Sequence, residues 1–225
     1  MDSQIVYKYI TDLTPNQREQ IDALYSLYSD WNSKINVISR KDMDCFYLHH
    51  VLHSLALSMF LKEFLPQTQA RMKDGACGTW VMDVGCGGGF PGIPMAILYP
   101  QTSFLLVDSI GKKVKVAQSV ADEIGLENVI TLHSRAEEVN LKELIKKDKA
   151  DLIISRAVTS LANFIPWVKG RYNDGILYLK GGNLEEEIAE AQKKCRIRPS
   201  QIFQKEISDW FREDYFLEKK VIFIS

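Results

Sequence analysis

The sequence contains few cysteines, and their arrangement excludes the sites that cysteines usually build. The four are scattered, form no Cys-x-x-Cys pair and have no histidine-rich segment beside them; they are Cys45, Cys77, Cys86 and Cys195. Structural zinc sites and disulfide frameworks both need close or paired spacings. We therefore expect reduced thiols, with Cys86 as a small residue in a turn, and no metal site.

Long apolar runs are also missing. Charge or glycine interrupts every apolar stretch before the ~18 residues that a membrane span needs. The start of the chain, MDSQ, lacks the basic and apolar blocks of a signal peptide. With 225 residues, 46% of them hydrophobic, the chain can bury one substantial core. These features predict a globular cytoplasmic protein that does not bind membranes.

The sequence has no excess of charge of one sign. Its 28 Lys and Arg residues balance 29 Asp and Glu residues, for a formal net charge of -1. Any RNA partner would therefore need a local basic patch. Basic segments near residues 112–115, 146–149 and 193–198 could supply one. In the second of these, Glu143 and Asp148 lie among the lysines, which favours an ordinary solvated helix face.

The first part of the chain is predicted to form a helical cap. From Pro15 to about residue 65, apolar residues recur every three or four positions, for example Ile21, Leu24 and Tyr28. Thr14 before Pro15 is typical of a helix start. The stretch 66–78 contains a proline and two glycines, which indicates a link to the next unit. We place the cap and linker at residues 1–78.

After residue 78, short β-rich segments alternate with helical ones. The predicted strands are 80–84, 104–107, 129–132, 152–154, 176–179, 201–207 and 221–224. The predicted helices lie near 93–98, 112–124, 137–147, 160–169 and 184–194. Such alternation predicts an α/β fold, with helices on both faces of a mostly parallel sheet. Residues 79–225 are therefore expected to form a Rossmann-like domain with seven strands.

The first of these strands runs into a glycine-rich turn. Residues 81–92 read VMDVGCGGGFPG, with glycine at 85, 87 and 89. A dinucleotide fingerprint would need a third glycine at position 90, which is Phe90. The spacing G-x-G-x-G instead favours S-adenosylmethionine over NAD. Asp108 ends the next strand, where a carboxylate can accept hydrogen bonds from ribose hydroxyls. Pro91 is predicted to lie in the first turn of the following helix.

The residues after the later strands narrow the choice of methyl acceptor. Where enzymes that methylate exocyclic amines carry Asn/Asp-Pro-Pro-aromatic, this chain reads SRAV at 155–158. No cysteine follows the fourth or fifth strand, which disfavours methylation at pyrimidine C5. Guanine N7 has a free lone pair and needs no general base. Basic residues at the strand ends, namely Arg135, Arg156 and Lys180, suit that acceptor.

Six blocks of the sequence together resemble one protein family. They are WNSKIN at 31–36, DVGCGGGFPGIP at 83–94, VDS at 107–109 followed by two lysines, RAE at 135–137, SRA at 155–157 and LKGG at 179–182. The chain resembles the bacterial small-subunit (16S) ribosomal RNA guanine-N7 methyltransferase family, also called RsmG or glucose-inhibited division protein B. The resemblance implies a class I methyltransferase fold, S-adenosylmethionine as cofactor, and small-subunit ribosomal RNA or a ribosomal particle as partner. A monomer is expected.

The resemblance also implies roles for individual residues. The cofactor would contact the glycine turn, the ribose acid, the segment after the third strand and one arginine: Gly85, Gly87, Gly89, Phe90, Asp108, Ala136, Glu137 and Arg156. Arg135 and Lys180 would orient guanine or phosphate. A basic residue at a strand end can equally pair with an acid such as Glu137 or Glu138, and this alternative stays open.

Three features leave the role of the remaining residues open. The family usually reads His-x-x-Asp-Ser in the second helix, whereas this chain has HVLHS at 50–54, with His53 in place of the acid. We expect His53 to cap a helix or face RNA. The segment 31–42 would be a lid, an RNA arm or ordinary packing with Trp31 as anchor. The aromatic residues near 210–216 are expected to lie in the core.

Three other functions compete with RNA methylation. A small-molecule methyltransferase would have the same fold and a deep apolar substrate pocket. A cofactor-sensing RNA-binding protein would bind both ligands without catalysis. An NAD oxidoreductase is disfavoured by Phe90, which replaces the third glycine.

Overall fold

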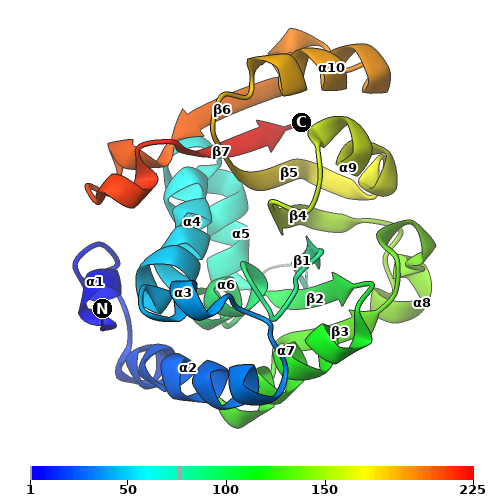
Figure 1. Ribbon diagram of the computed structural model, residues 1–225. Coiled ribbons are helices and arrows are strands. Elements are labelled where there is room, and N and C mark those ends of the chain that lie inside the picture. The colour runs from blue at the N-terminus through cyan, green and yellow to red at the C-terminus, as the bar shows by residue number, and fades with distance from the viewer. Residues whose placement is uncertain (1, 76–77) are drawn as a thin grey trace.

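The computed structural model describes residues 2–75 and 78–225, so the prediction for Cys77 lies outside the described residues. One seven-stranded sheet has the order β3-β2-β1-β4-β5-β7-β6 (Figure 1). The strands are β1 Trp80–Val84, β2 Ser103–Asp108, β3 Val129–His133, β4 Ala150–Arg156, β5 Tyr172–Gly181, β6 Ile202–Glu206 and β7 Lys219–Ile224. Strands β1 to β5 pair in parallel, and β7 is antiparallel to β5 and β6. The predicted mostly parallel α/β fold is confirmed.

Alternate residues of the central strands pack into two separate apolar cores. Val81 points into a core shared with the N-terminal helices, whereas its neighbour Met82 points into the core on the other face. This period of two is what a sheet buried on both faces requires. Helices α6 Gly92–Leu98 and α7 Gly111–Glu123 cover the first face together with the cap. Helices α8 Leu141–Ile145, α9 Leu161–Val168 and α10 Glu185–Cys195 cover the second.

The cap contains more helical segments than the periodicity suggested. They are α1 Gln4–Tyr7, α2 Pro15–Lys34, α3 Arg40–Met43, the π-helical turn η1 Tyr47–Leu52, α4 His53–Phe64 and α5 Pro66–Asp74. At the start of α2, Thr14 and Gln17 form the reciprocal cap that a Ser/Thr before a proline favours. The division of the chain at residue 78 stays a prediction.

The predicted linker 66–78 was wrong for its first nine residues, which form α5. Pro66 begins this helix, and Gly75 ends it with φ of 64°. Both residues are helix boundary signals as well as loop signals, so the sequence alone did not separate the two cases. Pro91 also differs from its prediction, because it occupies the position before the first residue of α6.

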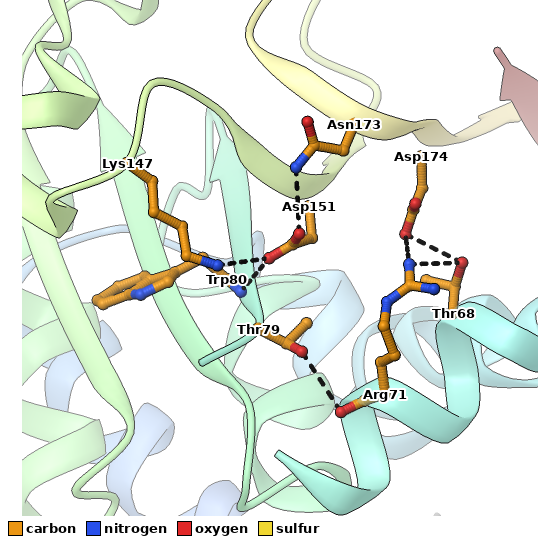
Figure 2. A network of polar contacts seen from close by, with 8 residues as sticks. All are labelled: Thr68, Arg71, Thr79, Trp80, Lys147, Asp151, Asn173 and Asp174. Carbon is orange, nitrogen blue, oxygen red and sulfur yellow. Dashed lines mark hydrogen bonds and ion pairs between the residues drawn. The ribbon is translucent and has the colours of Figure 1, made fainter. Parts of the chain in front are cut away.

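Helix α5 is anchored at the amino end of the sheet. There Arg71 pairs with Asp174 of β5, and Thr68 Oγ1 donates to the same carboxylate at 3.0 Å (Figure 2). Close by, Asp151 of β4 accepts hydrogen bonds from Trp80 N at 2.9 Å and Asn173 Nδ2 at 3.2 Å. This network joins β1, β4, β5 and α5, and leaves the opposite end of the strands for other contacts.

Short 3-10 segments complete the second half of the chain. They are η2 Ala136–Glu138, η3 Pro199–Gln201, η4 Ile207–Asp209 and η5 Asp214–Phe216. Phe211, in the segment between η4 and η5, and Phe216, at the end of η5, lie in the core between the sheet and the cap, where both are fully buried. The expected core position is confirmed for these two of the four aromatic residues near 210–216, whereas Trp210 and Tyr215 are half-buried and pack against the core. Tyr215, between them, has a different environment that is described below.

Candidate cofactor and substrate site

A cavity of about 430 Å³ opens at the carboxyl ends of β1, β2 and β4. Ligands bind at this end of the strands in parallel α/β sheets. The cavity brings together seven of the eight residues that were predicted to hold the cofactor: Gly85, Gly87, Phe90, Asp108, Ala136, Glu137 and Arg156. Among the described residues, Gly89 is the one of that set that does not line it.

The glycine turn after β1 has the backbone shape that its sequence predicted. Gly85 and Gly87 have φ of 72° and 56°, in the left-handed region that favours glycine. A Cβ at Gly85 would collide with Val158 Cγ2 in the segment after β4. Gly89 has φ of 110°, and a Cβ there would collide with Ile93 of α6. Gly89 therefore allows α6 to pack against the turn, instead of lining the cavity.

Asp108 at the end of β2 is fixed by two backbone donors. Its Oδ2 accepts a hydrogen bond from Gly87 N and its Oδ1 from Ile110 N, both at 2.8 Å. The residue is 8% exposed and lines the cavity. Each carboxylate oxygen keeps acceptor capacity beyond one hydrogen bond. These remaining acceptor positions match two hydroxyl donors on adjacent carbons, such as those of a ribose.

The cap supplies part of the cavity wall through Val37 and Ile38. Tyr28 of α2 is buried and donates to Gly88 O at 2.6 Å, which ties the cap to the glycine turn. Asn32 Oδ1 accepts from Val37 N and Ile38 N, each at 3.0 Å. Val37 and Ile38 then line the cavity. The segment 31–42, left open above, thus includes a wall that Asn32 holds in place, and Trp31 packs partly buried against the core.

The turn after β3 forms the wall around Ala136 and Glu137. Arg171, the residue before β5, donates to Ala136 O at 3.0 Å and Val139 O at 2.7 Å, and so fixes η2. The sequence did not point to Arg171. Arg135 is exposed and lines the same cavity. No ion pair joins Arg135 to Glu137 or Glu138 in the part of the chain that the structure describes, and its contact with guanine or phosphate stays a prediction.

Arg156 lies between this cavity and a second one of about 200 Å³. Both Arg156 and Ala157 line the two cavities. Arg156 Nη1 donates to His49 O at 3.1 Å, and Nη2 donates to His50 Nδ1 at 3.0 Å. Its guanidinium also lies 5.3 Å from the centroid of the Phe90 ring. The other residues of the second cavity are Asp42, His49, His50, His53, Leu179, Lys180, Gly181, Tyr215 and Lys219.

The structure places Lys180 in the second cavity and Arg135 in the first. Lys180 Nζ forms an ion pair with Glu187 and donates to Thr159 O at 2.9 Å. Pairing with an acid, the alternative considered above, therefore holds for Lys180, although the partner is Glu187. The two basic residues that were predicted to orient guanine or phosphate thus border different cavities.

The π-helical turn η1 carries two histidines toward the second cavity. Single π turns recur at functional sites because they redirect side chains. His50 Nδ1 accepts from Arg156, so the neutral ring carries its proton on Nε2. Burial, with the nearby Arg156 charge, lowers the pKa of His50 to about 3. His50 Nε2 has no hydrogen-bond partner among the described residues.

His53 is the C-cap residue of η1 and the first residue of α4, and its ring lies in the wall of the second cavity. The position at a helix boundary agrees with the expected cap, and a contact with RNA stays a prediction. His53 is 5% exposed, and its Nδ1 lies 3.3 Å from Tyr215 Oη. Burial, and then the Arg156 charge, lowers the pKa of His53 well below its ordinary value. Its Nε2 has no partner in the described part of the chain. The ring is therefore neutral and sits where the family usually has a carboxylate.

Asp83 is a buried carboxyl beneath the glycine turn. Its Oδ2 accepts a hydrogen bond from Gly92 N at 2.7 Å, while Oδ1 has no partner among residues 2–75 and 78–225. Burial raises the pKa of Asp83 to about 8, although the Gly92 hydrogen bond and the Arg156 charge act in the opposite direction. The sequence motif contained Asp83, but its periodicity did not reveal that one oxygen is left unbonded.

Among the described residues, no group of three or more His, Cys, Asp or Glu side chains is placed to hold a metal ion. Within the same residues, no helix combines the length and apolar character that a membrane crossing needs.

Comparisons with known proteins agree with this site. The model of the GidB family, described as rRNA small subunit methyltransferase G, matches residues 17–210. The chain is 46% identical to ribosomal RNA small subunit methyltransferase G of Bacteroides thetaiotaomicron, over 98% of each chain. It is 43% identical to the protein of that name from Christiangramia forsetii, over 100% of this chain and 97% of the relative. Among solved structures, human methyltransferase 10 domain containing protein matches 76% of this chain and 82% of its own, at 12% identity and a TM-score of 0.54.

Proposed function

Because the chain belongs to the rRNA small subunit methyltransferase G family, we propose that it methylates N7 of a guanine in small-subunit ribosomal RNA. The family resemblance and the class I methyltransferase fold are confirmed, and the methyl donor of such an enzyme is S-adenosylmethionine. The observation that carries the choice of acceptor is the pair of cavities that share Arg156 and Ala157. One cavity suits the donor, and the other suits a base that lies beside it.

The residues of the first cavity fit the cofactor. Asp108 would accept hydrogen bonds from the ribose hydroxyls, because both of its oxygens keep free acceptor capacity. Gly85, Gly87 and Phe90 would line the remainder of the cofactor, with Ala136 and Glu137 beside the adenine. When bound, S-adenosylmethionine supplies an electrophilic methyl group on a sulfonium. The protein then has to align this group with a nucleophile and exclude water.

The titratable side chains of the second cavity are weak general bases, which supports N7 as the nucleophile. Hydrogen bonds from Ser39 and His49 lower the pKa of the Asp42 carboxyl. The unprotonated nitrogen of His50, Nδ1, already accepts a hydrogen bond from Arg156. Burial keeps the pKa of both His50 and His53 low. Lys180 is held by Glu187 as an ion pair. Attack by an exocyclic amine would require a group that takes up a proton, whereas attack by N7 requires none. Positioning is therefore the main contribution of these side chains.

The remaining roles are part of the same proposal. Lys180 would orient the guanine from the second cavity, and Arg135, at the rim of the first, would contact an RNA phosphate. The partner would be ribosomal RNA or a ribosomal particle. The protein would bind it as a monomer in the cytoplasm. Arg135 and Lys180 carry donors and no acceptor, which suits both tasks.

The test is methyl transfer with a labelled donor. Purified protein, labelled S-adenosylmethionine and small-subunit RNA or particles from cells that lack the gene should give label in the RNA. Reduction and aniline treatment should then cleave the RNA at one guanine. Label without cleavage would show a different acceptor atom. Binding of both ligands with no change in RNA mass would favour a non-catalytic RNA-binding protein, and transfer that does not need RNA would favour a small-molecule enzyme.

A further inference from the structure

We propose that the second cavity holds the target guanine and that Asp42 reads its Watson–Crick edge by accepting hydrogen bonds from N1–H and the 2-amino group. The inference rests on the proposed function, since it names the substrate contact of that same site. The first observation is where Asp42 lies relative to the cofactor cavity. Arg156 and Ala157 form a wall of both cavities, whereas Asp42 lines only the second. A purine that presents N7 at the shared wall directs its opposite edge away from the cofactor.

Asp42 is an ionised acceptor that its neighbours hold in place. Its Oδ2 accepts from Ser39 Oγ at 2.7 Å, and its Oδ1 accepts from His49 Nδ1 at 3.0 Å. These two hydrogen bonds, that of Ser39 first, lower the pKa of Asp42. Each oxygen retains capacity for another hydrogen bond. A fixed carboxylate of this kind matches two adjacent N–H donors.

Flat side chains give the cavity a surface for a planar ring. The rings of His49 and Tyr215 are stacked with their centroids 4.0 Å apart and their planes 16° apart. Both residues line the cavity, although 166 positions separate them in the chain. Bases taken out of a stack are commonly held against aromatic side chains in this way. The stack makes a nucleobase a better match than an isolated phosphate.

The charges around the cavity match guanine more closely than other ligands. Arg156, Lys180 and Lys219 contribute donors, which suit the O6 acceptor. Adenine would turn its N1 lone pair toward the Asp42 carboxylate, an unfavourable contact. A phosphate would likewise be repelled by that carboxylate. His53 also favours an uncharged ligand surface, because it is buried and neutral with its Nε2 unbonded among the described residues.

The experiment compares guanine with inosine at the target position. Inosine lacks the 2-amino group but keeps N1–H, O6 and N7. The wild-type protein should methylate RNA that carries guanine roughly 10- to 100-fold faster, in kcat/KM, than RNA that carries inosine. Asp42→Asn should lose most of the activity on guanine and little on inosine, so the ratio of the two should approach one. Its affinity for S-adenosylmethionine, measured by calorimetry, should be unchanged.

A neighbouring acid gives a matched control. Asp44→Asn makes the same chemical change two residues away, and Asp44 is not among the residues that line this cavity. This variant should keep the wild-type ratio. The comparison with inosine in the wild-type protein needs no variant, so the test does not depend on how Asp42→Asn folds.

The outcomes separate this inference from the proposed function. Methyl transfer to guanine with equal rates on inosine in the wild-type protein would overturn the reading role of Asp42 alone. A guanine-to-inosine ratio that Asp42→Asn leaves unchanged would do the same. No methyl transfer to any small-subunit RNA by the wild-type protein would overturn the proposed function, and this inference with it.

Discussion

Carboxylates at the two ends of the sheet differ in how many of their oxygens have hydrogen-bond partners. At the amino end, Asp151 accepts hydrogen bonds from Trp80 N and Asn173 and pairs with Lys147, so its oxygens are engaged within the protein (Figure 2). At the carboxyl end, buried Asp83 has a single backbone donor, and one of its oxygens is unbonded among the described residues. Strands β1 and β4 that carry these two acids are neighbours.

The difference separates polar groups that stabilise the fold from polar groups that are available to a ligand. A buried polar atom without a partner costs free energy, and proteins retain such atoms mainly at functional sites. The amino end therefore needs no ligand to satisfy its groups. The carboxyl end holds Asp108 with spare acceptor capacity and two histidines with an unbonded Nε2 in the described structure. Substitutions at the two ends should accordingly change different properties.

The largest difference between the two ends of the sheet is expected when Arg156 and Arg71 are each replaced by Met. Arg156→Met removes the guanidinium that borders both cavities and leaves His49 O and His50 Nδ1 without their donor. Because truncation of a buried, hydrogen-bonded charge costs about 2–5 kcal/mol, we expect kcat/KM for RNA methylation to fall by about 100-fold or more. Arg71→Met, at the amino end, should lower the melting temperature and leave kcat/KM within about threefold of wild type. Equal losses of kcat/KM in both variants would contradict the contrast.

Asp108→Ala should have the next largest effect, on cofactor binding. It removes the proposed acceptor of the ribose hydroxyls and the partner of Gly87 N. We expect the affinity for S-adenosylmethionine to weaken by ~1–3 kcal/mol, measured by calorimetry. Unchanged affinity would remove Asp108 from the site.

The raised pKa of Asp83 predicts how stability depends on pH. In the unfolded chain this carboxyl loses its proton near its ordinary pKa, whereas burial raises the pKa in the folded protein to about 8. Between these two values the unfolded state binds fewer protons, so Asp83 makes the free energy of unfolding fall as pH rises, with no further change above about 8. Asp83→Asn should remove this dependence.

The measurement is urea unfolding of the ligand-free protein at pH 5 and pH 8. Relative to wild type, Asp83→Asn should gain roughly 3–4 kcal/mol more at pH 8 than at pH 5. The Asn side chain keeps an oxygen that can accept from Gly92 N. A difference between variant and wild type that is the same at both pH values would show that Asp83 does not titrate in this range.

The smallest effect is expected for Asp151→Ala. The change removes a partly buried acceptor from Trp80 N and Asn173 at the amino end. We expect a loss of ~1 kcal/mol in the free energy of unfolding, with the affinity for S-adenosylmethionine unaltered. A weaker affinity would mean that the two ends of the sheet are coupled, and would break the comparison.

Local sequence patterns were sufficient for the strands, the glycine turn and the position of Asp108. Alternating apolar residues and left-handed glycines are properties of short segments, so the chain carries that information within a few residues. The same local signals gave a wrong prediction at residues 66–74, where a linker was expected. Pro66 begins a helix there and Gly75 ends it. The local signals were also silent on Tyr28 and Asn32, whose partners lie in the glycine turn and in the next loop.

The second cavity depends on contacts that no local pattern contains. His49 meets Tyr215 across 166 positions, and Arg156 meets His50 across 106. Arg135 and Lys180 look alike at their strand ends, yet they border different cavities. The chain's own residue order thus specifies the fold class and the cofactor turn, because backbone preferences act over a few residues. Packing of the cap and of η5 against the sheet specifies which side chains meet, because burial and partner choice involve the whole molecule.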